Sequence, residues 1–327
     1  MLRLPNDGAP TGVPLDEFLP EDHGPAAIVL ALARAVPALA DRLAAGKLYG
    51  DPAAIVGTND SGDAQKALDV GAHDHMLAAL RAAGVRQVLS EEDPHVATLN
   101  PGGAWDVAIV PIDGSGSIGI GAPLGMLFSI LPADPVGFLR RGRSVVASGY
   151  ASFGHSCDFG WSLGDGVHIA TYDRALGGFR VVREHVRLKP EAKTIAYNAS
   201  NERHWHPGLK QWALDLRAGK EGPRARDFNM RWLAAAVGEL QRLLLLGGVF
   251  LYPADRRKGY EQGRLRTIYE AVPIAFLIEQ AGGKATDGLS PILDRLPQEL
   301  HEHTPLVFGA ADEVNLIARY LTITKAP

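Results

Sequence analysis

The sequence has a single cysteine, no apolar run long enough to cross a membrane and no excess of charge of one sign. Cys157 alone cannot form an internal disulfide or a structural zinc site, so we expect a reducing compartment and a small buried thiol. The most apolar run, residues 243–254, is too short to span a bilayer, and the N-terminus lacks the apolar core of a secretory signal. These absences predict a cytoplasmic protein without membrane contact.

The charge balance excludes a further class of function. The 327 residues include 33 Lys and Arg against 37 Asp and Glu, a formal net charge of -4, which provides no general basic field for nucleic acid. Any anion must therefore be held by a local group of residues. With 46% hydrophobic residues, the chain can bury a large core, in one large domain or in two closely packed ones.

Apolar periodicity in the first half predicts two helices followed by a large sheet. Helical spacing covers residues 24–45, with Pro37 as a kink or break, and residues 66–83, which Gly84 ends. The polar residues 57–65 between these helices predict a mobile loop. Short β-rich runs between residues 85 and 190 then indicate the strands of a large sheet.

The second half begins near residue 192 and mixes helices and strands. The predicted helices are 208–218, 226–245, 271–281 and a last one from 311, and the predicted strands are 248–254 and 305–309. We therefore predict an α/β layered (α+β) fold of stacked helix and sheet layers, with one half at residues 1–190 and the other at 191–327.

Carboxylates follow two of the predicted strands directly. The segment VLSEEDP (88–94) places Glu91, Glu92 and Asp93 after an apolar run, and the apolar segment DVAIVPI ends at Asp113. Adjacent carboxylates repel one another unless they are solvated or share a cation. Hard divalent cations such as magnesium bind several oxygens that converge from different segments. A shared cation and a solvated acidic turn are the two interpretations that this pattern leaves open.

Further acids lie near the predicted starts of helices. Glu270 follows Arg264 and Arg266 closely, and a glutamate at such a position, taken by itself, is more often a cap or a partner of the helix dipole than a metal ligand. Asp63 and Asp69 flank a loop-to-helix junction, where Asp63 could be an N-cap. Carboxylates, arginines and a Gly/Ser turn together are the components that metal-assisted phosphoryl transfer requires.

A glycine pattern offers a competing hypothesis. Gly114, Gly116 and Gly119 spell G-x-G-x-x-G, which is typical of a dinucleotide-binding loop when a helix begins at the third glycine. Here Gly119 is followed by Pro123 and an apolar, strand-like run. We therefore interpret these glycines as a turn that exposes backbone amides to a phosphate.

The sequence resembles class I fructose-1,6-bisphosphatases, in the metal-dependent sugar phosphatase superfamily that also holds inositol monophosphatase. The resemblance extends over residues 15–320, approximately, and rests on eight segments in family order. These segments are GTNDSGDAQKALDV, VLSEED, PIDGS, GMLFSI, LGDGVHIATYD, AYNASNERHW, GGVFLYPAD and GRLRTIYEAVPIAFLIEQAGG. The last of them is the most specific.

The resemblance implies a sugar-phosphatase fold, a homotetramer and magnesium-dependent hydrolysis of the 1-phosphate of fructose 1,6-bisphosphate. The half at 1–190 would carry the metal and phosphate site, and the half at 191–327 the sugar and 6-phosphate site. The implied metal ligands are Glu91, Ile112 through its carbonyl, Asp113 and Glu270, and the implied catalytic residues are Glu91, Glu92, Asp63 and Asp69.

The resemblance also implies two groups of substrate contacts. The residues Asp113, Gly114, Ser115, Gly116 and Arg266 would hold the 1-phosphate, and Asn198, Arg231, Tyr252 and Arg264 the 6-phosphate and sugar. Arg231 would reach the neighbouring subunit's site. Taken singly, Tyr252 is equally a core aromatic residue, Asn198 a turn cap and Arg231 a solvated helix charge.

The sequence departs from the family pattern where the signature places its first, metal-bridging Asp. Val110 stands there, and it has no side-chain oxygen to offer a metal ion. Gly116 and Ser117 replace a serine and an asparagine, Trp232 a tyrosine and Arg264 a lysine. Two functions follow as alternatives: an active sugar bisphosphatase, or a catalytically weakened member that acts as a sugar-phosphate binder or regulatory subunit.

Overall fold

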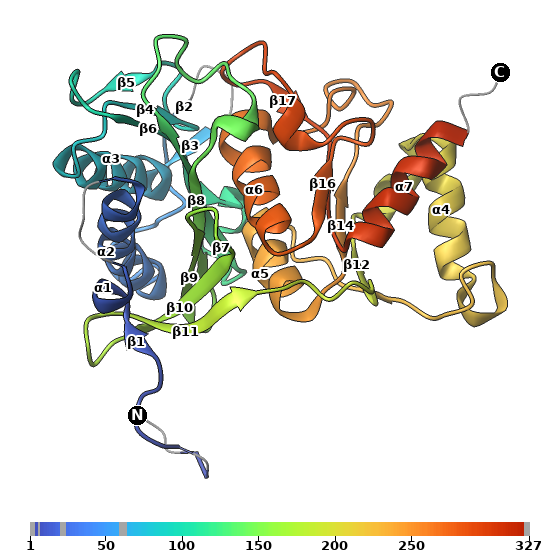
Figure 1. Ribbon diagram of the computed structural model, residues 1–327, viewed down its shortest axis with the longest axis horizontal. Helices are drawn as coiled ribbons and strands as arrows, with labels where there is room; N and C mark the ends of the chain where they lie inside the picture. The colour runs from blue at the N-terminus through green and yellow to red at the C-terminus, as the bar shows by residue number, and fades with distance from the viewer. Residues whose placement is uncertain (1–3, 6, 20–23, 59–63, 324–327) are drawn as a thin grey trace.

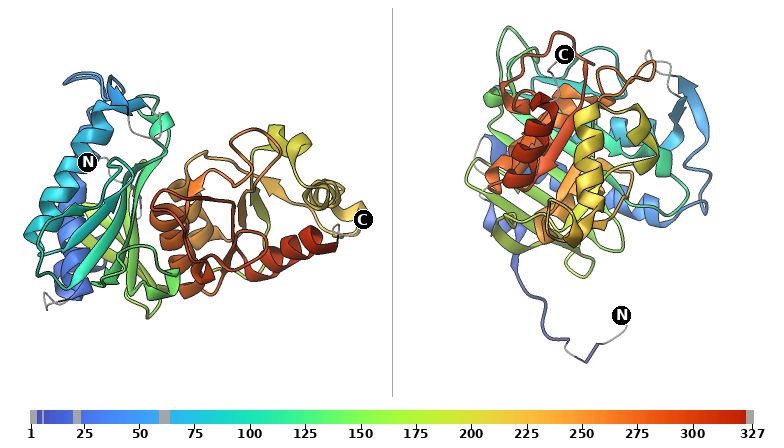
Figure 2. Two further views of the ribbon diagram at one scale, coloured as in Figure 1. Left: turned by 90° about the horizontal axis from the view of Figure 1, so that it is seen from above. Right: turned by 90° about the vertical axis from the view of Figure 1, so that its right-hand side faces the viewer.

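The computed structural model describes residues 4–5, 7–19, 24–58 and 64–323, whose elements form alternating layers of helix and sheet (Figure 1). Helices α2 (Pro25–Ala44) and α3 (Ala67–Ala82) cover one face of a large sheet. Helices α5 (Ala236–Leu246) and α6 (Val272–Gln280) lie between this sheet and a smaller one. Helices α4 (Pro207–Arg217) and α7 (Ala311–Ile323) cover the outer face of the smaller sheet, as both views of Figure 2 show. The predicted layered fold is confirmed.

The large sheet has nine strands in the order β1-β11-β10-β9-β8-β7-β6-β4-β5. Its strands are β1 (Val13–Pro14), β4 (Gln87–Ser90), β5 (Ala97–Thr98), β6 (Trp105–Asp113), β7 (Leu124–Pro132), β8 (Ala147–Phe153), β9 (Cys157–Ser162), β10 (Val167–Asp173) and β11 (Gly178–Val186). Neighbouring strands are antiparallel except β4 and β6, which run parallel with Ser90 opposite Ile109. This parallel pair brings the ends of both strands to one edge of the sheet.

The smaller sheet has five strands in the order β13-β12-β14-β18-β16. Its strands are β13 (Asn229–Met230), β12 (Thr194–Ala196), β14 (Val249–Tyr252), β18 (Leu306–Gly309) and β16 (Lys284–Thr286). Two short antiparallel pairs stand apart: β2 (Ile55–Thr58) with β3 (Ala64–Lys66), and β15 (Leu265–Arg266) with β17 (His303–Thr304).

The apolar patterns explain which elements lie innermost. In β6, Val107 and Ile109 enter the core beneath α2 and α3, while Ala108 and Val110 enter the core between the two sheets. A strand that is buried on both faces reads as a continuous apolar run rather than an alternating one. Helix α6 is buried from Val272 to Ile278, because apolar layers cover it on both sides.

Most predicted elements are confirmed, and three expectations are wrong in part. Pro37 lies inside α2 and does not break it. The loop predicted for 57–65 is strand at both ends, in β2 and β3, and residues 59–63 lie outside the described residues. The helix predicted for 226–245 begins only at Ala236, because Asn229 and Met230 pair as β13 with β12. The strands β9, β12 and β16 were not predicted, since each is short or weakly patterned.

The single cysteine and the lack of a long apolar run led to expectations about Cys157 and about membranes. Cys157 is half-buried at the start of β9, and burial, then the nearby charge of Asp158, raises the pKa of its thiol to about 12. A thiol with so high a pKa is a poor nucleophile. Over the described ranges, none of the helices combines the length and apolarity that crossing a bilayer requires.

Candidate functional site

The parallel pair β4–β6 places the predicted carboxylates at one edge of the large sheet. The amide of Glu91 donates to the carbonyl of Ile109 at 3.3 Å, so the acidic segment continues the ladder beyond β4. Asp113 ends β6 after a bulge that interrupts the pairing with β7 between Val110 and Asp113. A bulge re-aims the side chains that follow it.

Asp113 is buried against the first turn of α5. Its Oδ2 accepts a hydrogen bond from the amide of Val237 at 2.8 Å, and only 6% of the residue is exposed. Burial raises the pKa of Asp113 to about 6, and hydrogen bonds from the amides of Val237, Ala236 and Gly114 oppose this increase. The helix start therefore holds the carboxylate in place without neutralising it.

Gly125, opposite Asp113 on β7, lets α5 approach this closely. A Cβ at Gly125 would lie 2.3 Å from the Cβ of Val237, which is closer than packed carbon atoms allow. We expect Gly125→Ala to lower the free energy of unfolding by about 1–3 kcal/mol, because α5 must shift. Urea unfolding followed by circular dichroism measures this, and Gly116→Ala, where a Cβ meets nothing within 4 Å, is the matched control.

Glu270 comes to the same edge from the second half of the chain. It lies in a π-helical turn, Thr267–Ala271, that precedes α6, and its Oε2 accepts from the amide of Arg266 at 2.6 Å. Burial, then the charge of Asp113, raises the pKa of Glu270 to about 8. Glu270 and Asp113 are therefore close enough for their charges to interact.

Glu91 completes this group of acids. Burial raises the pKa of its carboxyl well above the ordinary value, and the charges of Glu270, Glu92 and Asp113 add to the increase while Arg266 opposes it. The structure thus brings together carboxylates from the segment after β4, the end of β6 and the turn before α6. We call Glu91, Asp113 and Glu270 the carboxylate group.

Strand β3, which leads into α3, lies beside the acidic segment. The Gln65 side chain donates to the carbonyl of Glu92 at 3.0 Å and to its Oε2 at 3.3 Å. Asp69 is buried: its Oδ2 accepts from the amide of Lys66 at 3.1 Å, and its Oδ1 has no hydrogen-bond partner among the residues that the structure describes. Asp63 lies outside the described residues.

The donor set fits a hard divalent cation. Neighbouring carboxylates with raised pKa values, together with the Oδ1 of Asp69 that has no partner among the described residues, are stabilised when a cation shares them. As placed, no three His, Cys, Asp or Glu side chains in the described part of the chain stand close enough to ligate one ion, so binding would require side-chain rotation. The side chain of Ile112 packs in the core, which leaves only its carbonyl for such a role.

The Gly/Ser turn follows Asp113 directly. Gly114 has a φ of +79°, and a short 3₁₀ turn, Ser115–Ser117, begins after it. The carbonyl of Ser115 accepts from Lys66 Nζ at 2.5 Å, which ties the turn to the start of α3. No α-helix begins at Gly119, and β7 follows instead, so the dinucleotide hypothesis is excluded.

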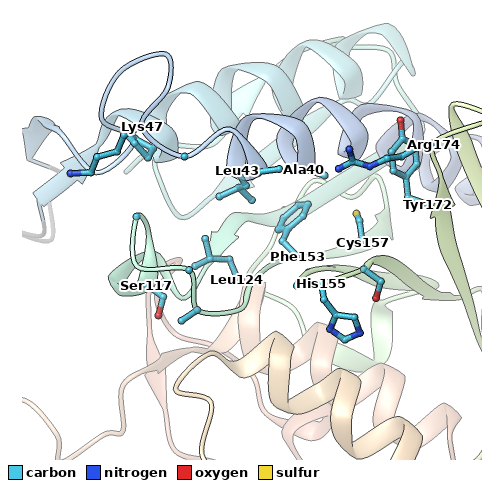
Figure 3. A pocket seen from close by; sticks show the side chains of 18 of the residues that line it. Ala40, Leu43, Lys47, Ser117, Leu124, Phe153, His155, Cys157, Tyr172 and Arg174 are labelled. Carbon is cyan, nitrogen blue, oxygen red and sulfur yellow. The ribbon is translucent and has the colours of Figure 1, made fainter. Parts of the chain in front are cut away.

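A cavity of about 530 Å³ lies beside this turn rather than over the carboxylate group (Figure 3). Leu43, Leu124 and Phe153 line it together with Ser117 and Lys47. The members of the carboxylate group do not contribute to its lining. The cavity is therefore distinct from the acids.

Of the predicted sugar and 6-phosphate residues, Tyr252 and Arg264 interact through their charges, while the hydrogen bonds of Asn198 and Arg231 are local. Burial raises the pKa of Tyr252 while the charge of Arg264 opposes this, and the Arg264 guanidinium lies 5.3 Å from the ring centre of Tyr260. Asn198 caps a 3₁₀ turn through a hydrogen bond from the Ser200 amide. Arg231 is exposed and donates to the carbonyl of Met230.

Three residues near the site were missed from the sequence: Gln65, Lys66 and His301. His301 contacts both Tyr269 and Pro94. Their contacts join segments far apart in the chain, and a single sequence gives no signal for such pairs. Only the position of Lys66, three residues before Asp69, hinted at a helix start.

Val110 occupies an apolar environment. It is fully buried in the core between the two sheets, in the same cluster as Leu89, Ile268 and Tyr269. The position therefore lies on the side of β6 that faces the turn carrying Glu270.

Family models, curated relatives and a solved structure all indicate the same family for this chain. The chain matches Fructose-1-6-bisphosphatase, N-terminal domain, over residues 27–184, and Fructose-1-6-bisphosphatase, C-terminal domain, over residues 188–322. It is 50% identical over 283 residues to Fructose-1,6-bisphosphatase class 1 of Brucella anthropi and of Brucella suis, covering 86% of this chain and 83% of each relative. It also superimposes on the crystal structure of Leishmania major fructose-1,6-bisphosphatase in holo form with a TM-score of 0.88 and 27% identity, over 95% of this chain and 99% of that one.

Proposed function

The chain belongs to the fructose-1,6-bisphosphatase family, and we propose that it hydrolyses the 1-phosphate of fructose 1,6-bisphosphate with magnesium as its cofactor. The products are fructose 6-phosphate and inorganic phosphate, so the protein is a phosphoric monoester hydrolase. The observation that carries this proposal is the carboxylate group, which three separate segments supply beside a Gly/Ser turn. The comparisons do not favour the weakened binder that Val110 suggested.

The family is metal-dependent, and the donors favour magnesium as the ion. Glu91, Asp113 and Glu270, with the carbonyl of Ile112, would hold it. A bound divalent cation would supply positive charge to the phosphate oxygens and lower the pKa of a coordinated water.

The remaining residues of the site would bind and orient the reactants. The amides of residues 114–116 and the Arg266 guanidinium would hold the 1-phosphate and offset the charge on its oxygens. Glu92 and the unpartnered Oδ1 of Asp69 would accept hydrogen bonds from the attacking water and orient it. The water oxygen would bond to phosphorus and give up one proton to the carboxylate of Glu92 as the bond between phosphorus and the sugar oxygen breaks, and one proton would pass to that sugar oxygen, so that the net change is one water consumed.

The two halves would divide the substrate between them. Residues 1–190 would supply the turn at 114–116 and most acids, and residues 191–327 would supply Tyr252, Arg264 and Asn198 for the sugar and 6-phosphate. Arg231, which is exposed on this chain, would serve the neighbouring subunit's site in a homotetramer. Light scattering during size-exclusion chromatography measures the oligomeric state directly.

Phosphate release tests the activity itself. The purified protein should release phosphate from fructose 1,6-bisphosphate in the presence of magnesium and lose this activity in a chelator. Fructose 6-phosphate is the control, because it lacks the 1-phosphate. Absence of phosphate release with magnesium, from protein shown to be folded by circular dichroism, would contradict the proposal.

Val110→Asp tests whether this position still faces the metal site. In a chelator, the new carboxylate would be buried among apolar side chains, and we expect the free energy of unfolding to fall by about 3 kcal/mol. Magnesium should restore most of this loss and bind about tenfold more tightly than to wild type, because one more ligand is available. Unfolding with and without magnesium measures both effects. A loss of stability that magnesium does not reduce would show that residue 110 faces away from the ion. Val110→Asn is the uncharged control.

A further inference from the structure

The segment that follows α6 and β16 returns to the site as a short connection, residues 299–304, across the turn that carries Glu270. β17 pairs antiparallel with β15, with Arg266 opposite His303. The amide of Thr267, the first residue of the π-helical turn, donates to the carbonyl of Glu302 at 2.8 Å. This segment therefore sets the position of the turn from outside.

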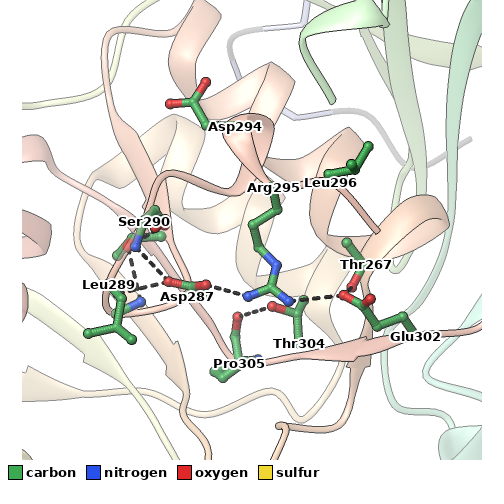
Figure 4. A network of polar contacts seen from close by, with 12 residues as sticks. Thr267, Asp287, Leu289, Ser290, Asp294, Arg295, Leu296, Glu302, Thr304 and Pro305 are labelled. Carbon is green, nitrogen blue, oxygen red and sulfur yellow. Dashed lines mark hydrogen bonds and ion pairs between the residues drawn. The ribbon is translucent and has the colours of Figure 1, made fainter. Parts of the chain in front are cut away.

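A network of charged side chains holds this segment in place (Figure 4). Arg295 donates to Glu302 Oε1 at 2.9 Å and is also paired with Asp287. Glu302 Oε1 accepts in turn from the hydroxyl of Thr267 at 3.3 Å. The backbone of residues 301–304 is thus anchored independently of any cation in the site.

From this anchored segment, His301 reaches both halves of the site. Its Nδ1 lies 2.9 Å from the hydroxyl of Tyr269, the residue before Glu270. Its Nε2 lies 3.2 Å from the carbonyl oxygen of Pro94, which follows the acidic segment Glu91–Asp93. Its own carbonyl accepts from Arg266 at 2.7 Å. One residue therefore contacts Pro94 directly after the acidic segment, the turn that carries Glu270, and Arg266.

The partners define the state of the ring. A carbonyl oxygen can only accept, so Nε2 must carry the hydrogen that is donated to Pro94. In the neutral ring Nδ1 then accepts from the hydroxyl of Tyr269. Both bonds are made by the neutral imidazole, which adds no charge to the site.

The electrostatics of the site explain why such a link is needed. When both are ionised, Glu91 and Glu270 carry like charges on separate segments, and the charge of Glu270 raises the pKa of Glu91. Without a cation, their repulsion pushes the acidic segment and the turn apart. A neutral hydrogen-bonded bridge between these segments opposes that separation without competing for a metal ion.

We propose that His301 is a positioning residue, which holds the segment of Glu91 and the turn of Glu270 at the separation that the reaction requires and fixes the direction of Arg266. The proposal rests on the proposed function and extends it to a residue that does not touch the substrate. It predicts that the side chain of His301 affects metal affinity and kcat more than KM.

Two conservative variants separate the two bonds. In His301→Gln the side-chain amide can still donate to the carbonyl of Pro94, whereas in His301→Asn an amide oxygen near the place of Nδ1 can still accept from Tyr269. We expect His301→Ala to lower kcat about tenfold or more and to weaken Mn²⁺ binding to the metal-free protein about fivefold, with KM changed less than about threefold. His301→Gln should recover more of both than His301→Asn, because the bond to Pro94 is the one that joins the halves.

The measurements are steady-state kinetics, calorimetric titration with Mn²⁺ and thermal unfolding. His95→Ala is the matched control, an exposed histidine beside Pro94, and should leave all three unchanged. The proposal would be overturned if folded His301→Ala kept its Mn²⁺ affinity and kcat. It would also be overturned if these losses only followed a lower melting temperature and His301→Gln recovered none of them.

If His301→Ala does not fold, Tyr269→Phe removes one of the two bonds and is tested in the same way. If wild type binds Mn²⁺ but releases no phosphate, the proposed function fails while the titration still decides the role of His301.

Discussion

Replacing Glu91 with glutamine is expected to lower kcat for phosphate release by about a thousandfold or more while the protein stays folded. Glutamine keeps the shape of the side chain and removes its charge. The carboxylate group then loses one of the acids that would hold the cation, at the end of β4. Steady-state phosphate release at saturating magnesium measures this loss.

Glu91→Gln should lower kcat but should not lower the stability of the metal-free protein. Glu91 is surrounded by the charges of Glu270, Glu92 and Asp113, so its removal lowers repulsion in the metal-free protein. The melting temperature in a chelator should therefore be unchanged or higher, and the increase produced by magnesium should be smaller than in wild type. Glu279→Gln, a glutamate that pairs with Arg143 on the surface, is the matched control. A kcat within about tenfold of wild type would refute the assignment of Glu91.

Arg266→Ala is expected to lower kcat/KM by about a hundredfold to a thousandfold, because the cation that would hold the 1-phosphate is lost. The residue is only 9% exposed, and its guanidinium donates to the carbonyl of His301. The charge of Arg266 also opposes the increases in pKa of Glu91 and Glu270. Its removal should therefore lower the melting temperature of the metal-free protein, the reverse of the result for Glu91→Gln.

Arg143→Ala is the control for the loss of an arginine. Arg143 pairs with Glu279 and Asp294 at the surface, and exposed pairs of this kind contribute little. Its removal should leave kinetics and melting temperature close to those of wild type. If Arg266→Ala behaved as Arg143→Ala does, the phosphate would have to be held elsewhere.

Local sequence patterns predicted the layers and the ends of β4 and β6, because apolar runs followed by acids are readable within about ten residues. Glu91 and Asp113 lie at one edge of the sheet because β4 and β6 pair in parallel. No local sequence pattern predicts this pairing. The approach of Glu270 depends on the packing of α6 between two sheets. Here the family resemblance, and not the periodicity, indicated Glu270 as a partner of Glu91 and Asp113.

The elements and residues that the sequence did not predict also depend on long-range contacts. β13 is two residues long and is defined by its pairing with β12 rather than by its own side chains. His301 looks like an ordinary polar residue in the segment LHEHTP, and its importance follows only from contacts with Tyr269 and Pro94, the latter 207 residues away. Residues whose role depends on long-range contacts require the three-dimensional structure.

The most direct test of the account is the position of the cation. Crystals of the active protein grown with Mn²⁺ and fructose 6-phosphate, measured at the manganese absorption edge, locate the ion by its anomalous scattering. The account predicts a peak between Glu91, Asp113 and Glu270, next to the turn at residues 114–116, and its loss in Glu91→Gln. A peak at another place in the protein, with these three carboxylates turned away from it, would contradict the account.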